Sequence, residues 1–177
     1  METSSTDKKD LTIYQVIEMI YDKYGNTSEG DQETLTDFYS RNRAYWFFTV
    51  KCLNKYIREM KDLTDLQSII YGKRQEAVDA YRNLVSMIST MSEDYKKKVA
   101  ASYEKIKTQK IPNTTVYLYS TDTAIRQQLD GMYSHEKYLI DIADNHAKYL
   151  EDTIRSIDDI IYAIPNRIRL EEIKLGL

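Results

Sequence analysis

Residues 125–164 read IRQQLDGMYSHEKYLIDIADNHAKYLEDTIRSIDDIIYAI, and this stretch decides the fold because one set of positions recurs with the period of a packed helix. Steps of four and three residues alternate without interruption along Ile125, Leu129, Met132, Glu136, Leu139, Ala143, His146, Leu150, Thr153, Ile157, Ile160 and Ile164. Such steps form the seam by which a coiled-coil helix contacts its partners. The sequence therefore predicts one helix over about 122–164, about 60 Å long at about 1.5 Å per residue, ended by Pro165.

The same stretch holds both histidines of the chain, in the acidic segment HEKYLIDIADNH. Eleven residues span about three helical turns, so His135 and His146 would lie about 16 Å apart. Metal ligands lie about 2 to 2.6 Å from their ion, so these two imidazoles cannot share one metal. The paired Glu-x-x-His motifs of a di-iron bundle are also absent. We expect no metal site and no cofactor, and we interpret His146 as a polar seam residue.

The rest of the chain also reads as helical segments joined by short breaks. Thr12 and Gln15 have the spacing of a capping box, and Gly25 is a typical helix stop. Pro112 cannot continue a helix, and the VYLY segment after it is extended in character. Near residue 91 successive steps of four replace the alternating seam, which locally unwinds a coiled coil. These signals predict a flexible tail over 1–9, helices over 12–24, 35–61, 63–110 (with a bend near 91) and 122–164, a hairpin tip over 111–121 and a C-terminal tail over 165–177.

Composition favours long helices in one domain. The 177 residues include only five glycines and two prolines, and 42% of them are hydrophobic and 30% charged. This is typical of a folded helical protein with few breaks. We predict an all-α fold: a long antiparallel helical hairpin over 63–164, coiled-coil-like, with two N-terminal helices packed on it in a single helical bundle over 10–164.

The sequence also indicates a compartment. Its apolar runs are too short to span a membrane, and the polar start METSSTDKKD lacks the apolar core of a signal peptide. The one cysteine, Cys52, excludes an internal disulfide framework and is typical of a reducing environment. We expect a cytoplasmic protein with no membrane partner.

Charge is divided between segments, although the net charge is only −3. Acidic residues dominate 1–34 and 122–163, whereas basic residues dominate 35–61 and 93–110. One interpretation is that acidic and basic helices complement each other within the bundle. The other is that a basic face is left for a partner.

Motifs for catalysis are absent from the sequence. Neither GxxxxGK[ST] nor GxGxxG occurs, so no phosphate-binding glycine loop is expected. We interpret Cys52 as a small packing residue at the edge of an apolar helix face. We therefore expect a protein that is not an enzyme and takes no small-molecule substrate.

The best candidate for a partner-binding site lies in AYWFFTVKCLNKYIR, residues 44–58. At about 100° per residue, most apolar side chains of this helix share one broad arc. A second strip lies outside that arc and consists of Phe47, Phe48, Lys51, Lys55 and Arg58. Either the helix is central and covered on both sides by its own chain, or the strip binds a second copy or another macromolecule, apolar at its centre and basic at its rim.

These observations lead to two hypotheses of function. The first is a non-catalytic protein–protein interaction or assembly protein, a homo-oligomer or part of a larger complex, because a long hairpin needs further helices to cover its seam. The alternative is a nucleic-acid-binding subunit using the basic faces of residues 41–61 and 96–110, since lysines beside aromatic rings suit single strands. Its candidate contacts are Lys96, Lys97, Lys98, Lys105, Lys107, Lys110, Tyr117 and Tyr119.

Overall fold

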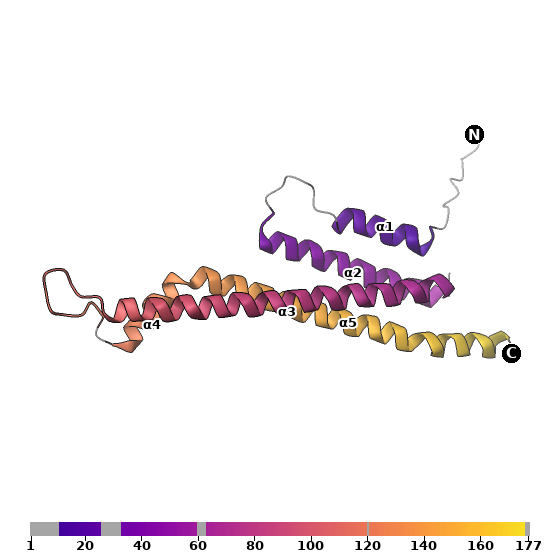
Figure 1. Cartoon of the computed structure of the whole chain (residues 1–177). Coiled ribbons are helices and arrows are strands. Elements are labelled where there is room, and N and C mark those ends of the chain that lie inside the picture. The colour runs from indigo at the N-terminus through magenta and orange to yellow at the C-terminus, as the bar shows by residue number, and fades with distance from the viewer. Residues whose placement is uncertain (1–10, 26–32, 60–62, 120, 176–177) are drawn as a thin grey trace, which may run out of the picture. The chain divides into compact units, whose positions relative to one another are not determined.

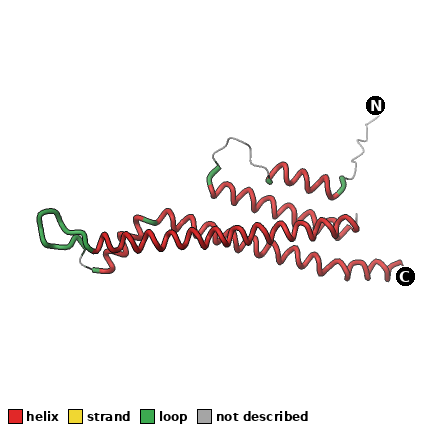
Figure 2. Tube along the Cα trace, viewed as in Figure 1, coloured by secondary structure: helices red, strands yellow, loops and turns green. Residues whose placement is uncertain are grey.

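A computed structural model of the chain describes residues 11–25, 33–59, 63–119 and 121–175. The predicted tail over 1–9, and residues 60 and 61 of the predicted second helix, lie outside this description. The described residues form helices and no strand, which confirms the all-α fold (Figures 1 and 2). The helices are α1 (Ile13–Tyr24), α2 (Leu35–Glu59), α3 (Leu63–Lys107), α4 (Asp122–Met132) and α5 (Ser134–Leu175). No helix of the described residues combines the length and apolar character of a membrane span.

The chain divides into two compact units, which are described in turn. Unit 1 comprises Met1–Asp79 and Tyr149–Leu177, and unit 2 comprises Ala80–Lys148. Helices α1 and α2 belong to unit 1 and α4 to unit 2, whereas α3 and α5 each contribute residues to both. The single domain and the continuous hairpin over 63–164 stay predictions.

The predicted seam of the last helices is buried at most of its positions. In the described structure the buried seam residues are Ile125, Leu129, Ala143, His146, Leu150, Thr153, Ile157 and Ile160. The hydroxyl of Thr153 donates to the carbonyl of Tyr149 at 2.9 Å, so this buried polar group is satisfied within its own helix. Burial at alternating steps of four and three is what a packed helix requires.

The helix expected over 122–164 is interrupted at Tyr133, which corrects the sequence prediction. Tyr133 ends α4 with φ −113° and ψ 17°, outside the helical region. The change follows Gly131, a poor helix former. Met132, a predicted seam residue, is 51% exposed, and Tyr133 packs instead against the cluster of Ile106, Ile125 and Leu129. Packing of the larger ring therefore outweighs continuity of the helix at this position.

Pro165 does not end the last helix, which is a second correction. Helix α5 continues through Pro165 to Leu175, so residues 165–175 are helical and do not form the expected tail. A proline removes one backbone donor and crowds the preceding turn. The Pro165 side chain is exposed, so its ring meets solvent and displaces no packed neighbour. Helix α5 therefore continues despite the loss of one backbone hydrogen bond in its interior.

Unit 1 is held together by a buried face on α2. This face is formed by Tyr39, Tyr45, Trp46, Thr49, Cys52, Leu53, Tyr56 and Ile57. Helix α1 begins with the predicted capping box, in which Thr12 and Gln15 satisfy each other's backbone N–H groups, and it packs on α2 (Figure 1). Arg74 of α3 forms an ion pair with Asp158 of α5 at 2.5 Å. The pair joins α3 to α5 within this unit.

A polar group inside unit 1 links α2 to α3. The Tyr45 hydroxyl donates to a carboxylate oxygen of Glu76 at 2.8 Å and accepts from the Lys73 ammonium at 2.6 Å. Burial raises the pKa of Tyr45 far above its ordinary value, and the Glu76 carboxylate raises it further. The phenol therefore stays protonated and keeps its donor role at any physiological pH.

Unit 2 is built where the end of α3 meets α4 and the start of α5. The hydroxyls of Tyr133 and Ser102 lie 2.6 Å apart, and the Tyr103 hydroxyl donates to Asp122 at 2.8 Å. Lys98 lies 3.9 Å from Glu136. From Tyr103 back to Lys98 along α3, the contacting residue moves forward along the chain from Asp122 to Glu136. Within this unit the segments therefore run in opposite directions.

The tip of unit 2 is a short extended hairpin. Helix α3 ends at Lys107, before the expected end at 110, and Lys110 forms an isolated antiparallel bridge with Tyr117. Pro112 and Asn113, the latter with φ 64°, are the central residues of a type II turn closed by a backbone hydrogen bond of 3.1 Å. The extended character expected of VYLY thus accounts for the early end of the helix.

We predict that shortening Leu150 or Ile157 to alanine lowers the free energy of unfolding by about 2 to 5 kcal/mol, as large-to-small changes in a core do. The two side chains are 2% and 0% exposed. The measurement is chemical denaturation followed by circular dichroism. Tyr162→Ala is the matched control, because this side chain on the same helix is 76% exposed and should change stability by less than about 0.5 kcal/mol. Equal stability of all three variants would contradict the packed seam.

Candidate partner-binding groove

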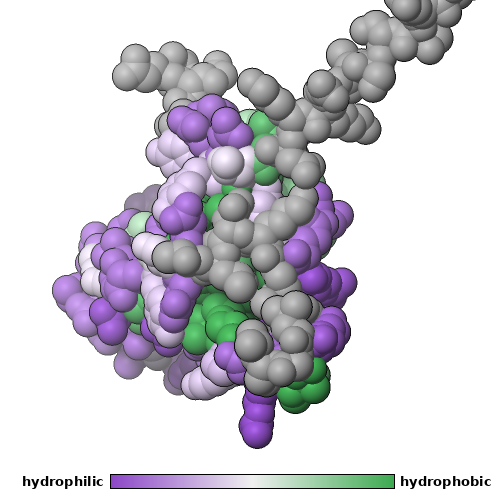
Figure 3. All heavy atoms as spheres, turned by 90° about the vertical axis from the view of Figure 1, so that its right-hand side faces the viewer, coloured by the Kyte–Doolittle hydropathy of each residue, from purple (hydrophilic) through white to green (hydrophobic). Residues whose placement is uncertain are grey.

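A groove of about 920 Å³ lies on unit 1, between α1, α2 and the part of α5 that belongs to this unit. All five predicted partner-binding residues line it: Phe47, Phe48, Lys51, Lys55 and Arg58. Helix α1 adds Val16 and Ile20, and α5 adds Tyr149, Asp152, Thr153 and Ser156. The space-filling view draws the end of unit 1 and shows hydrophobic atoms open to solvent among hydrophilic ones (Figure 3).

The two phenylalanines have different environments. Phe48 is half-buried and stacks on Tyr24 of α1, with ring centroids 5.0 Å apart and planes inclined by 11°. Phe47 is 57% exposed and touches only the edge of Phe48 in a T-shaped contact of 5.3 Å among the described ring pairs. The sequence left open whether these rings are covered by their own chain or exposed to a partner, and each alternative describes one ring. Phe48 is covered by its own chain, and Phe47 faces solvent.

Aromatic side chains with fixed hydroxyls form the walls of the groove. Tyr56 donates to the carbonyl of Leu11 at 2.6 Å, which joins α2 to the chain two residues before α1. Tyr149 donates to the carbonyl of Arg43 at 2.9 Å, which joins α5 to α2. The Arg43 guanidinium also lies 5.4 Å from the centre of the Tyr149 ring. Rings held in this way are rigid contact surfaces and lose little conformational entropy on binding.

The wall residues of α1 and α5 were not predicted from the sequence. Tyr149, Asp152 and Ser156 each lie one position before a seam residue, and this spacing is the signal that could have found them. Flanking a seam places a side chain at the edge of the helix contact, where grooves form. Which of several such edges borders α2 depends on tertiary packing.

Charged side chains of both signs line the groove, with one more cation than carboxylate. Lys51, Lys55 and Arg58 contribute three cations to the lining, and Glu59 and Asp152 contribute two carboxylates. Lys55 lies 3.9 Å from Glu59 within α2, at side-chain exposures of 67% and 39%. An exposed pair of this kind is worth little and leaves the ammonium accessible. The groove thus combines an apolar aromatic lining with a small excess of cations over carboxylates.

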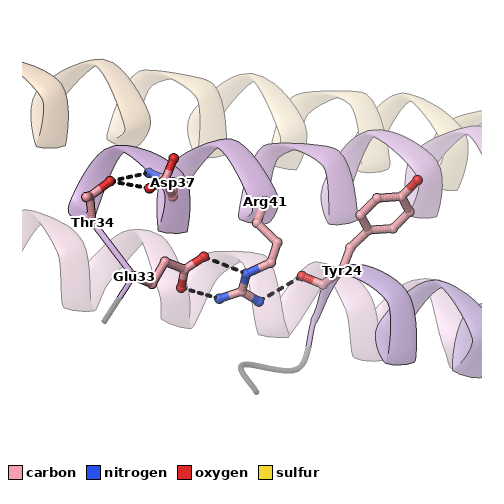
Figure 4. Close-up of polar contacts among 5 residues, drawn as sticks. All are labelled: Tyr24, Glu33, Thr34, Asp37 and Arg41. Atoms are coloured by element: carbon pink, nitrogen blue, oxygen red, sulfur yellow. Dashed lines mark hydrogen bonds and ion pairs between the residues drawn. The ribbon is translucent and has the colours of Figure 1, made fainter. Parts of the chain in front are cut away.

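An arginine on α2 fixes the position of α1, and with it one wall of the groove (Figure 4). The Arg41 guanidinium donates from Nε and Nη2 to the two oxygens of Glu33, at 2.9 and 2.8 Å, and from Nη1 to the Tyr24 carbonyl at 3.0 Å. The Tyr24 carbonyl lies at the end of α1, where backbone oxygens lack helical partners. The Arg41 guanidinium therefore caps the C-terminus of α1 and holds it on α2.

Cys52 also lines the groove, but its chemistry is that of a packing residue. The side chain is 7% exposed and its thiol is free. Burial raises its pKa, and the nearby Lys55 only partly opposes this. A thiol of this kind is protonated at neutral pH and is a poor nucleophile.

The predicted nucleic-acid contacts are spread over several directions of unit 2. On a helix, Lys96 and Lys107 share one side, whereas Lys98 and Lys105 share another, with Lys97 between them. The ammonium of Lys107 lies 5.7 Å from the Tyr103 ring centre, and that of Lys110 lies 5.4 Å from the centre of Tyr117. Tyr119 packs against the cluster of Ile106, Ile125 and Leu129, so its ring contributes to the core of the unit.

Comparison of the chain with protein-family models, curated proteins and solved structures finds no significant match. Within the described residues, no three histidine, cysteine or carboxylate side chains are grouped so as to hold a metal ion. The groove and its geometry are therefore the observations from which function is inferred.

We predict that the Arg41–Glu33 contact stabilises the protein only above the ordinary glutamate pKa. The hydrogen bonds from Arg41 hold the pKa of Glu33 below its ordinary value of 4.5. A depressed carboxylate pKa adds stability that is present above 4.5 and is lost as pH falls through the lower folded value. Glu33→Gln should thus lower the melting temperature at pH 6, and this difference should shrink as the pH falls below 4.5. A difference that is independent of pH, or one equally large in the exposed control Glu172→Gln, would contradict this role.

We predict that Cys52 reacts slowly with a thiol reagent in the native protein at pH 8 and rapidly in denaturant, because the buried thiol resists ionisation. The chain has one cysteine, so the rate of reagent consumption reports on this site alone. A native rate within about twofold of the denatured rate would mean that the groove wall is not packed as described.

Proposed function

We propose that the chain is a non-catalytic interaction or assembly protein that self-associates through helical surfaces, with the groove over α2 as its binding surface. The observation that carries the proposal is Phe47, a large apolar side chain that is 57% exposed inside a groove of about 920 Å³. Exposed apolar surface gathered in a concave site is typical of binding sites rather than of plain solvated surface.

The chemistry of the groove supports a protein partner. Interface centres are enriched in aromatic residues and arginine, and their rims are polar. Here Phe47 and Tyr149 are among the aromatic residues that line the groove, and Lys51 and Arg58 contribute charge. Unit 1 has further large apolar side chains in open positions: Leu11, Tyr14, Met19, Tyr21, Phe38, Tyr71, Tyr162, Ile168, Leu170 and Ile173. Covering part of this surface by a second copy would be favourable.

The alternative function is nucleic-acid binding through the basic faces of residues 41–61 and 96–110. The observation in its favour is Tyr117, which is 53% exposed and lies beneath the Lys110 ammonium. A ring and a cation so placed suit stacking on a base beside a phosphate.

For either function, the buried free thiol of Cys52 supports a reducing compartment such as the cytoplasm.

We predict that Phe47→Ser weakens self-association at least tenfold and leaves the melting temperature within about 2 °C of the parent. Burial of an apolar ring in an interface stabilises it by about 1.5 to 3 kcal/mol. Loss of the ring therefore weakens the Kd tenfold or more. The measurement is sedimentation equilibrium over a range of protein concentrations. Tyr162→Ser is the matched control, since it removes an exposed ring of unit 1 that does not line the groove.

Three outcomes decide between the functions. A parent chain that stays monomeric at every concentration would overturn self-association. An unchanged Kd for Phe47→Ser would show that the groove is not the site of self-association. Adding single-stranded and duplex nucleic acid to the same samples tests the alternative. Phosphate binding weakens steeply with salt, whereas apolar association does not.

A further inference from the structure

We infer that the occupant of the groove is helix α1 of a second copy of the chain. This inference rests on the proposed self-association and names the surface that meets the groove. It is carried by the exposed side of α1, which has the apolar and acidic character that a groove with an excess of cations would bind.

The exposed side of α1 forms a strip that is both apolar and acidic. The strip consists of Leu11, Tyr14, Glu18, Tyr21 and Asp22, of which the three apolar side chains are 45%, 52% and 46% exposed and the two acids are also exposed. At about 100° per residue the four helical positions fall within an arc of about 100°, and Leu11 precedes the helix. The opposite side of the helix carries Ile13, Val16 and Ile20, which are buried or half-buried.

Charge and spacing on the two surfaces are complementary. Glu18 and Asp22 lie four residues apart on α1, and Lys51 and Lys55 lie four residues apart on α2. Each pair therefore spans about 6 Å along its helix, so that antiparallel packing brings both acids opposite both lysines. Helix α1 has 12 residues, about 18 Å, which matches the distance along α2 from Phe47 to Arg58.

Symmetry allows both copies to bind at once. Val16 and Ile20 of α1 line the same groove, so the donor strip and the acceptor groove adjoin each other on one unit. A twofold axis then places α1 of each copy in the groove of the other, and the contact is closed and self-limiting. The pairing predicts a dimer rather than an open chain of copies.

The end of α5 is the competing occupant, and its charge argues against it. Ile168, Leu170 and Ile173 are exposed there, between 40% and 65%, so the segment has the apolar surface for docking. Arg167, Arg169 and Lys174 outnumber Glu171 and Glu172 in this segment, and the cations would face Lys51, Lys55 and Arg58. Like charges opposed across an interface oppose association.

The test exchanges charge between the two surfaces. One variant carries Lys51→Glu with Lys55→Glu, and the other carries Glu18→Lys with Asp22→Lys. All four side chains are exposed, and Lys51 and Lys55 line the groove. Each variant alone should self-associate at least about tenfold more weakly than the parent, because like charges meet at both halves of the dimer. An equimolar mixture should recover parental affinity, and so should a single chain with all four changes. Sedimentation equilibrium measures the Kd, and the fluorescence of Trp46 with circular dichroism verifies the fold.

The outcomes separate this inference from the proposed function. If the parent dimerises and both variants dimerise equally well, or if the mixture fails to recover affinity, α1 is not the occupant and another surface mediates self-association. If the parent is monomeric, self-association fails and this inference falls with it. Arg167→Glu with Arg169→Glu is the matched control, for which we expect an unchanged Kd. Tighter association of that variant would make the end of α5 the occupant and overturn the assignment to α1.

Discussion

The packing of α1 on α2 is the constraint on which the groove depends. Phe48 stacks on Tyr24, and Arg41 binds the carbonyl of that same tyrosine together with Glu33, so one residue of α1 is held through both its ring and its backbone. Release of α1 would expose Ile13, which is 0% exposed, and would remove Val16 and Ile20 from the groove wall. The binding surface and the stability of unit 1 therefore share the same contacts.

Much of the fold follows from the sequence because burial imposes a period on it. Leu150, Ile157 and Ile160 are buried where alternating steps of four and three place them. The rule fails at Met132, because the chain leaves the helical conformation at Tyr133 and a large ring competes for the same space. It fails again at Pro165, because the helix continues despite the cost of a proline in its interior. Both failures are local energetic balances that a periodic pattern does not contain.

The candidate site could be predicted only in part. The angular position of Phe47, Lys51 and Lys55 on α2 follows from helical geometry, and these residues do line the groove. The separate environments of Phe47 and Phe48 depend on where α1 lies, which no spacing within α2 reveals. In the same way, Tyr119 reads as a free ring in the sequence but packs in the core of unit 2, because the chain brings Ile106, Ile125 and Leu129 together around it.

The abundance of tyrosine has a mechanical consequence. Tyr56 and Tyr149 each bury a ring between helices and donate a hydroxyl to a backbone carbonyl of another segment, at 2.6 and 2.9 Å. Sliding one helix along its neighbour by a single residue would displace such a hydroxyl by about 1.5 Å, enough to break the bond. An apolar seam alone tolerates small longitudinal shifts, because one aliphatic contact replaces another. Unit 1 therefore resists slippage of its helices under a pull along their axes. Phenylalanine at these positions would lack the hydroxyl and would not provide this resistance.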